Sequence, residues 1–209
     1  PQAFAQVLRD RTARQILLIG LVNAAPVAVT STLFLFYVES RLTAPDAAGP
    51  LLLLFFMSAA LAAPLWTFLA ERFGLKRVLR AAMGLAIFSL FWVLFLNSGD
   101  VIAFGVICVL SGAAVGADMT LIPAVFAQRI AHIGASTTDG FGLWSFVSKF
   151  SLAVAAVILL PSLEFAGFRS GQENSVVALG VLTWTYALVP CALKLLAIAV
   201  LQRTDLRES

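Results

Sequence analysis

Two charged side chains, Asp118 and Lys149, lie inside apolar stretches of the sequence. The segment from Gly116 to Leu160 consists of two apolar spans joined by a short polar loop, with Asp118 in the first span and Lys149 in the second. An ionised side chain at the centre of a bilayer costs at least about 2.5–3.5 kcal/mol on insertion scales, and such residues face a bundle interior or an aqueous cavity. We therefore interpret the two charges as marking a polar pathway across a membrane.

The two charges lie at the same predicted depth. Asp118 is ten residues before the loop that begins near Gln128, and Lys149 is ten residues after Asp139, where the next span begins. At the helical rise, each is about 15 Å from the loop. This favours an Asp118–Lys149 pair, although consecutive helices need not touch, so separate positions stay open. Lys194 lies near the end of the last span, and we expect its stem to carry the ammonium to the cytoplasmic surface.

Trp144, Ser145, Ser148 and Lys149 share one face of a predicted helix, because they are spaced at i, i+1, i+4 and i+5. An indole supplies a flat stacking surface, and hydroxyls and an ammonium supply hydrogen bonds, a combination suited to a polyol. In the competing interpretation, Trp144 anchors the helix at the membrane interface and the serines bond to their own backbone. The sequence leaves both open.

A second polar face lies in the first apolar span. Asn23, Val27, Thr30 and Phe34 follow the i, i+4, i+7, i+11 rule for one helical face, and Pro26 is expected to kink the helix. This face is suited to lining a polar cavity. Helix–helix packing is the competing interpretation, because hydroxyl side chains often bond back to their own helix.

The composition indicates that these faces lie in a membrane protein. The chain has 209 residues, of which 61% are hydrophobic and 12% charged, whereas soluble domains are about 45–50% apolar and about 25% charged. Six apolar runs are long enough to span a bilayer, at about 16–38, 49–70, 79–97, 101–127, 140–161 and 175–201. An amphipathic cytoplasmic linker, 1–15, precedes them and a cytoplasmic tail, 202–209, follows. The sequence predicts an all-α protein with one six-helix transmembrane bundle.

Basic residues indicate how the bundle is oriented. Most of the 14 Lys and Arg residues fall on one predicted side: Arg9, Arg11, Arg14, Arg72, Lys76, Arg77, Arg80, Arg129, Arg203 and Arg207. Only Arg41 and Arg169 fall on the other side. The positive-inside rule therefore places both ends of the chain in the cytoplasm. The net charge of +3 comes from these clusters and gives no reason to expect a nucleic-acid partner.

A polar loop and two small-residue patterns complete the motifs. The loop ERFGLKR is interpreted as a cytoplasmic gating loop, with candidate residues Glu71, Arg72, Gly74, Lys76 and Arg77. Its glycine is suited to the positive φ of a tight turn. Gly112 and Gly116 form a small-residue surface that allows close helix approach. Cys108 and Cys191 lie inside apolar spans and are interpreted as packing residues. The sequence holds no metal-binding, nucleophile–base or phosphate-loop motif, so we expect no enzyme, metal or cofactor.

Five stretches of the sequence look familiar together: the Asn23…Pro26 stretch before LFLFYV, then ERFGLKR, ADMTLIPAVFA, FGLWSFVSKFSLAVAAVILLPSLEFAGF and YALVPCALKLLA. With them the chain resembles the C-terminal six-helix half of a major facilitator superfamily transporter. The closer similarity is to the glycoside–pentoside–hexuronide:cation symporter family, to which the melibiose permease belongs. The resemblance implies a twelve-helix fold, and we interpret Pro1 as the truncated edge of a protein whose N-terminal six-helix half is the missing partner.

The resemblance also implies a function. Members of this family carry a sugar or glycoside by alternating access, driven by Na⁺ or H⁺, in this case at a bacterial inner membrane. Lys149 occupies the position of a helix-eleven lysine that links cation and sugar, and Trp144, Ser145 and Ser148 fall where that helix approaches the sugar. The chain lacks the family's acidic residue near Gln128, which leaves the substrate and the ion open.

Two further departures lie in the basic loop, where Thr67 replaces the usual glycine and Glu71 the usual aspartate. Two other functions therefore stay open. The same fold can carry a lipid or another amphiphile, which a largely apolar cavity would favour. A membrane scaffold that transports nothing would tolerate neutral substitutions at Asp118 and Lys149.

Overall fold

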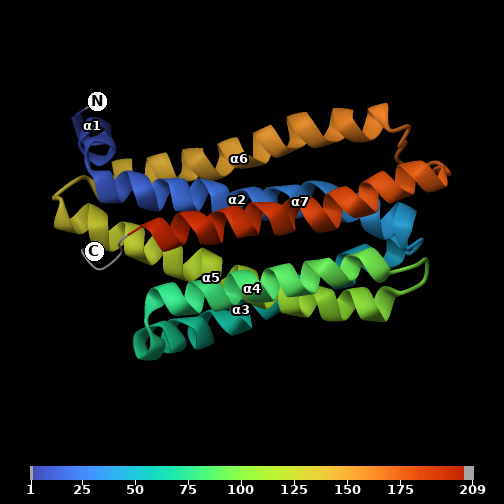
Figure 1. Cartoon of the computed structure of the whole chain (residues 1–209), viewed down its shortest axis with the longest axis horizontal. Helices are drawn as coiled ribbons and strands as arrows, with labels where there is room; N and C mark the ends of the chain where they lie inside the picture. The colour runs from blue at the N-terminus through green and yellow to red at the C-terminus, as the bar shows by residue number, and fades with distance from the viewer. Residues whose placement is uncertain (1, 205–209) are drawn as a thin grey trace.

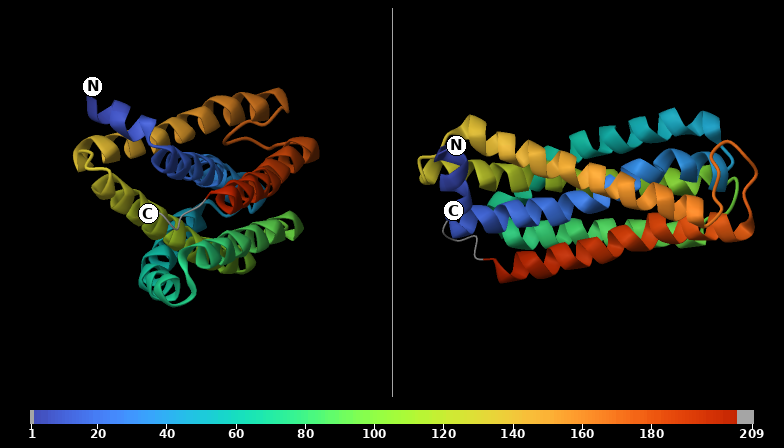
Figure 2. Two further views of the ribbon diagram at one scale, coloured as in Figure 1. Left: turned by 60° about the vertical axis from the view of Figure 1, so that its left-hand side comes forward. Right: turned by 90° about the horizontal axis from the view of Figure 1, so that it is seen from above.

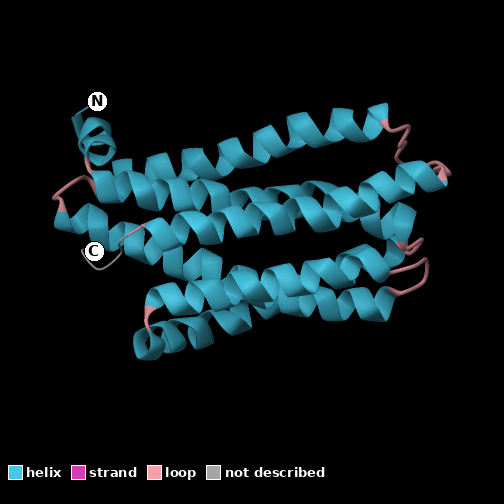
Figure 3. Ribbon diagram, viewed as in Figure 1, coloured by secondary structure: helices cyan, strands magenta, loops and turns pink. Residues whose placement is uncertain are grey.

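The structure, a computed structural model, describes the backbone of residues 2–204, and its regular elements are all helical (Figure 3). Their order is α1 (Gln2–Arg9), α2 (Arg11–Phe36), the π-helical turn η1 (Tyr37–Arg41), the 3₁₀ turn η2 (Pro45–Ala47), α3 (Ala48–Phe73), α4 (Leu75–Phe91), the 3₁₀ turn η3 (Trp92–Phe95), α5 (Val101–His132), α6 (Thr137–Phe165) and α7 (Val176–Arg203).

Within residues 2–204, six helical segments are long and apolar enough to cross a membrane. This confirms the predicted all-α fold with six membrane-spanning helices. The helices run past the predicted apolar spans: α5 continues to His132 and α6 begins at Thr137, so the loop expected at 128–139 is reduced to 133–136. The predicted linker 1–15 consists of α1, Asp10 and the first turn of α2. Part of the predicted tail, 205–209, lies outside the described residues.

Short polar residues set where several helices begin. The carboxylate of Asp10 accepts a hydrogen bond from the Ala13 N–H at 2.7 Å and so caps α2. The hydroxyls of Ser136 and Ser175 cap α6 and α7 in the same way. Each cap satisfies an N–H group that the first turn of a helix leaves without a partner. A glycine ends α3 at its C-terminus. Gly74 follows the last residue of the helix, and its φ of 89° confirms the predicted positive value.

The helices form two groups that lie side by side (Figure 1). α3 and α4 pack on α5, and α6 and α7 pack on α2. Contacts between α4 and α7 and between α2 and α5 join the groups. The view turned by 60° shows α6 far from α3 and α4, on the opposite side of α2 (Figure 2). α2 and α5 therefore form the centre of the bundle, while α3 and α6 lie at its edges.

The contact between α3 and α5 depends on two glycines. A Cβ on Gly112 would overlap the backbone carbonyl of Phe55, and a Cβ on Gly116 would overlap that of Ala59. Because each glycine lacks this atom, the two backbones touch directly. This confirms the prediction that Gly112 and Gly116 form a surface for close helix approach.

Apolar side chains make two separate buried cores and a broad apolar exterior. One core surrounds Tyr37 and Phe104, and the other surrounds Met83 and Phe126. Only three residues of α3 and five of α6 are buried. Their remaining surface is mostly apolar, so both helices need lipid or another apolar partner against them.

Candidate functional site

Asp118, Lys194 and Asn23 meet inside the bundle, from α5, α7 and α2. The Nζ of Lys194 donates hydrogen bonds to Oδ2 of Asp118 at 2.5 Å and to Oδ1 of Asn23 at 2.6 Å. Lys194 is 1% exposed, Asn23 3% and Asp118 8%. The second carboxylate oxygen of Asp118, Oδ1, is buried and has no hydrogen-bond partner among the described residues. We call these three residues the Asp118 cluster.

The Asp118 cluster lies at the boundary between the two apolar cores. On α2, it follows Ile19 of one core and precedes Ala28 of the other. On α7, it lies between Cys191 and Ala197, which also belong to different cores. A polar layer thus separates two apolar layers. Breaking such a pair by removing one partner is strongly destabilising.

The predicted position of Lys194 at the cytoplasmic surface is therefore wrong, because its ammonium points inward and is bound there. The ion-pair partner of Asp118 is Lys194, and not Lys149. The physical reason is the helix arrangement: α5 and α6 follow each other in the chain but share few contacts, because α6 packs mainly on α2. Lys149 was predicted as the partner because its helix follows that of Asp118 in the sequence. Two features of the sequence could have indicated the buried position of Lys194. Lys194 lies inside an apolar span, and Asn23, a possible hydrogen-bond partner, lies inside another.

Among the described residues, no hydrogen bond or ion pair joins the predicted face on α6 to the Asp118 cluster. Lys149 and Ser145 are exposed, and Lys149 forms no ion pair with a residue that the structure describes. The hydroxyl of Ser148 donates to the carbonyl of Trp144 at 3.0 Å, as the competing interpretation has it. The role of this face in binding a sugar stays a prediction.

The indole of Trp144 takes part in packing α6 against its neighbours. A Cβ on Gly20 of α2 would lie 2.7 Å from the indole, and the Phe126 ring of α5 has its centroid 5.4 Å away. Gly20 thus provides the space that the indole occupies. Trp144 joins α6 to both central helices.

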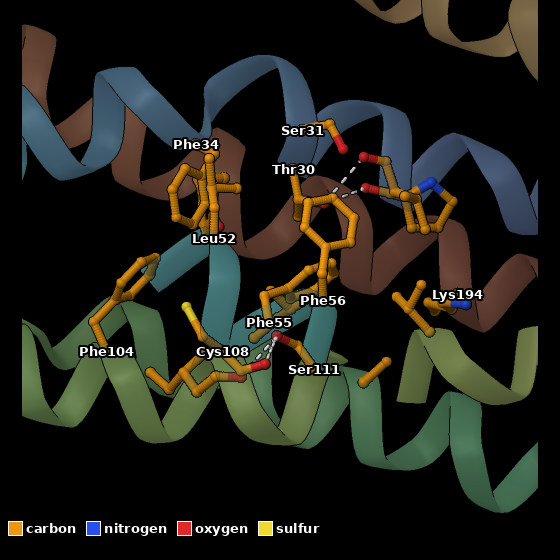
Figure 4. A pocket seen from close by; sticks show the side chains of 17 residues that line it. Thr30, Ser31, Phe34, Leu52, Phe55, Phe56, Phe104, Cys108, Ser111 and Lys194 are labelled. Carbon is orange, nitrogen blue, oxygen red and sulfur yellow. Dashed lines mark hydrogen bonds between the residues drawn. The ribbon is translucent and has the colours of Figure 1, made fainter. Parts of the chain in front are cut away.

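A cavity of about 290 Å³ lies beside the Asp118 cluster, between α2, α3, α5 and their neighbours. Lys194 lies at one end of it and Phe104 at the other (Figure 4). Three residues of the predicted face on α2 line this cavity, Val27, Thr30 and Phe34, while its fourth residue, Asn23, belongs to the Asp118 cluster. Its walls are mostly apolar and rich in aromatic rings, from Phe34, Phe55, Phe56, Phe104 and Tyr186.

Four polar side chains also line the cavity: Thr30, Ser31, Ser111 and Lys194. The hydroxyls of Thr30 and Ser111 donate to carbonyls of their own helices, at 3.1 Å to Pro26 and 2.7 Å to Ile107. A hydroxyl keeps its lone pairs when it donates, so both can still accept a bond from a guest molecule. The cavity is close to the lower end of the range for small-molecule sites, about 300–1,000 Å³.

The comparison with protein families decides what this architecture belongs to. Residues 2–208 match the family described as "MFS/sugar transport protein". The chain belongs to this family. The predicted membership of the major facilitator superfamily is thereby confirmed, while the narrower assignment to the glycoside–pentoside–hexuronide:cation symporters stays a prediction. A comparison with curated protein sequences finds no match.

Among solved structures, this MFS chain is similar to the proton:xylose symporter XylE of the same superfamily, bound to 6-bromo-6-deoxy-D-glucose. The TM-score is 0.64 at 21% sequence identity, and the match covers 96% of this chain and 44% of XylE. At this identity the likeness shows the fold alone. The chain spans less than half the length of the transporter that it matches.

The predicted gating loop of this MFS chain is an exposed turn between α3 and α4. Gly74 makes the turn, and the guanidinium of Arg72 lies 5.4 Å from the centre of the Phe73 ring. Glu71, Arg72, Lys76 and Arg77 form no ion pair with another described residue. Their role in gating stays a prediction.

A second ion pair, which the sequence did not predict, lies at the same end of the bundle. Nε and Nη2 of Arg129, on α5, donate to the two carboxylate oxygens of Asp10 at 3.0 and 2.8 Å. The hydrogen bond from Arg129 holds the pKa of the Asp10 carboxyl below its ordinary value, against the opposing effect of burial. Asp10 therefore both caps α2 and ties its start to α5.

Proposed function

We propose that this chain is one six-helix half of a secondary active transporter that moves a sugar or glycoside by alternating access, together with H⁺ or Na⁺. The observation that carries the proposal is the Asp118 cluster, which places a buried charge pair beside a cavity midway along the helices. Ionisable residues at such positions mark substrate and ion pathways. Substrate sites in secondary transporters lie near the bilayer midplane, between repeated halves.

The proposed sugar substrate is supported by the family description and by the polar groups that line the cavity. Hydroxyl acceptors on Thr30 and Ser111 and the ammonium of Lys194 match the alternating hydroxyls of a sugar. The likeness to a proton:xylose symporter agrees with this substrate class and with H⁺ as the coupling ion.

The proposed second half is supported by the apolar edges of the bundle. α3 and α6 bury few residues within the chain. The match to 44% of XylE leaves room in a complete transporter for another unit of similar size. We propose that this unit covers part of α3 and α6 and closes the cavity.

One observation favours a second candidate function, the transport of a lipid or other amphiphile. Five aromatic rings and several aliphatic side chains line the cavity, against four polar side chains. Such walls suit an apolar body with a polar head as well as the apolar face of a sugar ring.

The experiment that tests the proposal is uptake by the complete transporter in proteoliposomes. D-[¹⁴C]xylose, radiolabelled melibiose and radiolabelled lysophosphatidylcholine are supplied separately, with an imposed H⁺ or Na⁺ gradient. We expect uptake of a sugar that depends on one gradient, and none by residues 1–209 alone. Transport of the lysolipid and of no sugar would establish the second candidate. A folded protein that moves none of the three would overturn both in favour of a scaffold.

A further inference from the structure

We propose that the Asp118 cluster is a proton-binding site, and that a proton on Asp118 releases Lys194 to bind an acceptor group of the substrate in the cavity. This inference rests on the proposed transport function and specifies its coupling ion and the residues involved. Three observations carry it: the buried Oδ1 without a partner, the two bonds of Lys194, and the position of Lys194 in the cavity wall.

The geometry favours H⁺ over Na⁺. A sodium ion needs several oxygen ligands, but the ammonium of Lys194 already occupies the oxygens of Asp118 and Asn23 that point to the centre of the cluster. A second cation about 4 Å from the ammonium would be repelled by about 4 kcal/mol at an effective dielectric constant of 20. A proton needs one free lone pair, and Oδ1 of Asp118 provides it.

The charge balance links the proton to the substrate. In the cluster as the structure shows it, one carboxylate and one ammonium sum to zero. A proton that binds Oδ1 forms an O–H bond, turns the carboxylate into a neutral acid and leaves the ammonium as the net charge of +1. A buried cation without a counter-charge is costly, so a substrate that offers an acceptor oxygen to it lowers the free energy of the protonated state.

Lys194 is suited to this second role because it reaches both places. It is the one member of the Asp118 cluster that also lines the cavity. An ammonium has three N–H donors, and Asp118 and Asn23 accept two of them. Asn23 keeps its bond when Asp118 is neutral, so the ammonium stays anchored while the donor that held the carboxylate turns to the substrate. By linkage, the proton and the substrate then each raise the affinity for the other.

Among residues 2–204, no other ionisable group lies with Asp118 and Lys194 at this level of the bundle. α3 and α4 carry charged residues only near the turn at Gly74, and α2 contributes Asn23 to the cluster and charges only in its first turn. Lys149 of α6 is exposed and forms no ion pair with another described residue. The remaining titratable groups of α5 and α7 near this level, Cys108, Cys191 and Tyr186, belong to the apolar core around Tyr37.

The test compares two modes of transport in the complete transporter. Counterflow exchanges labelled for unlabelled D-xylose across the liposome membrane with no net movement of protons, whereas accumulation uses an imposed pH gradient. We expect the ratio of gradient-driven accumulation to counterflow to fall at least about tenfold in Asp118→Asn, whatever the loss of folded protein, and such a factor is within the range of ordinary coupling energies. The matched control is Asp46→Asn, an exposed aspartate of η2, which keeps both. Accumulation by Asp118→Asn equal to that of the wild type, or accumulation driven by a Na⁺ gradient alone, would overturn the inference.

A second measurement needs no variant, in case Asp118→Asn does not fold. D-xylose is added to the wild-type transporter in weakly buffered solution with a pH-sensitive dye. We expect the protein to take up protons when it binds the sugar. Binding without proton uptake would refute this inference and leave the proposed function standing. If the wild type exchanges neither D-xylose nor another sugar of the uptake screen, the proposed function fails, and the inference that rests on it fails with it.

Discussion

Lys194 and Lys149 both lie within apolar helices, yet their surroundings are opposite. Lys194 is 1% exposed and bonded to two side chains from two other helices. Lys149 is exposed, on a helix of which only five residues are buried. The first lysine belongs to the interior of this six-helix unit, and the second points away from it. A charge in a membrane helix is therefore satisfied either within its own bundle or by something that approaches from outside.

This difference predicts different effects of removing each lysine. Lys194 has its counter-charge, so removing it changes the stability of the bundle as well as its chemistry. Lys149 has no ion-pair partner among the described residues, and the role between cation and sugar that the resemblance to cation symporters implies for it stays a prediction. We expect its partner to come from the proposed second half.

The largest expected effect comes from breaking the buried pair. Lys194→Met leaves the carboxylate of Asp118 buried without a counter-charge, which should destabilise the protein by about 3–5 kcal/mol. The loss should appear as a lower thermal unfolding temperature of the complete transporter in detergent. Lys149→Met is the matched control and should unfold close to the wild-type temperature. The double variant Asp118→Asn with Lys194→Met should recover most of the loss. Equal unfolding temperatures for Lys194→Met and Lys149→Met would contradict the comparison of the two lysines.

An intermediate effect is expected at the contact between α3 and α5. Gly116→Ala places a methyl group against the carbonyl of Ala59, and overpacking of this kind costs about 1–3 kcal/mol. Gly105→Ala, on the same helix, is the control, because its methyl group would meet Leu51 and Leu54 at an ordinary 3.7 Å. Thermal unfolding of both variants measures the difference. If Gly105→Ala unfolded at a lower temperature than Gly116→Ala, the close contact between Gly116 and the backbone of Ala59 would be wrong.

The smallest effect on stability, and the sharpest on transport, is expected at Lys149. Lys149→Ala removes an exposed side chain and should change stability by no more than about 0.5 kcal/mol. Cation-driven uptake by the complete transporter should nevertheless be abolished, if Lys149 links the cation to the sugar as the resemblance implies. Thermal unfolding and gradient-driven uptake, measured on one preparation, separate the two effects. Unchanged accumulation would remove Lys149 from the mechanism.

The sequence predicted the features that depend on local pattern. Hydropathy gives the six spans, since a bilayer-crossing helix must be apolar along its length. The turn at Gly74 and the glycine contact of α5 follow from the missing Cβ of glycine. The periodicity of α2 put Asn23, Val27, Thr30 and Phe34 on one face. Val27, Thr30 and Phe34 line a mostly apolar cavity, whereas Asn23 binds Lys194 in the Asp118 cluster.

The sequence did not predict which helices touch. Asp118 was expected to pair with a lysine on the next helix, but α7 and not α6 brings the ammonium to it. The Asp118–Lys194 pair could not be predicted for two reasons. The order of helices in the chain does not determine their neighbours in a bundle, and the long side chain of a lysine can reach either inward or to the surface. The ends of α5 and α6 were missed because a helix continues into polar residues beyond the membrane, where apolar pattern gives no signal.

The direct backbone contact at Gly112 and Gly116 also limits how the bundle can move. Two helices whose backbones touch cannot slide or rotate past each other without a collision, so α3 and α5 should travel as one rigid rod in any conformational cycle. α6 is held differently, by side-chain packing on α2 that includes the indole of Trp144 in the space left by Gly20. A ring can rotate and re-pack where a backbone cannot, so relative displacement within the bundle should concentrate at α6, the helix that carries Lys149.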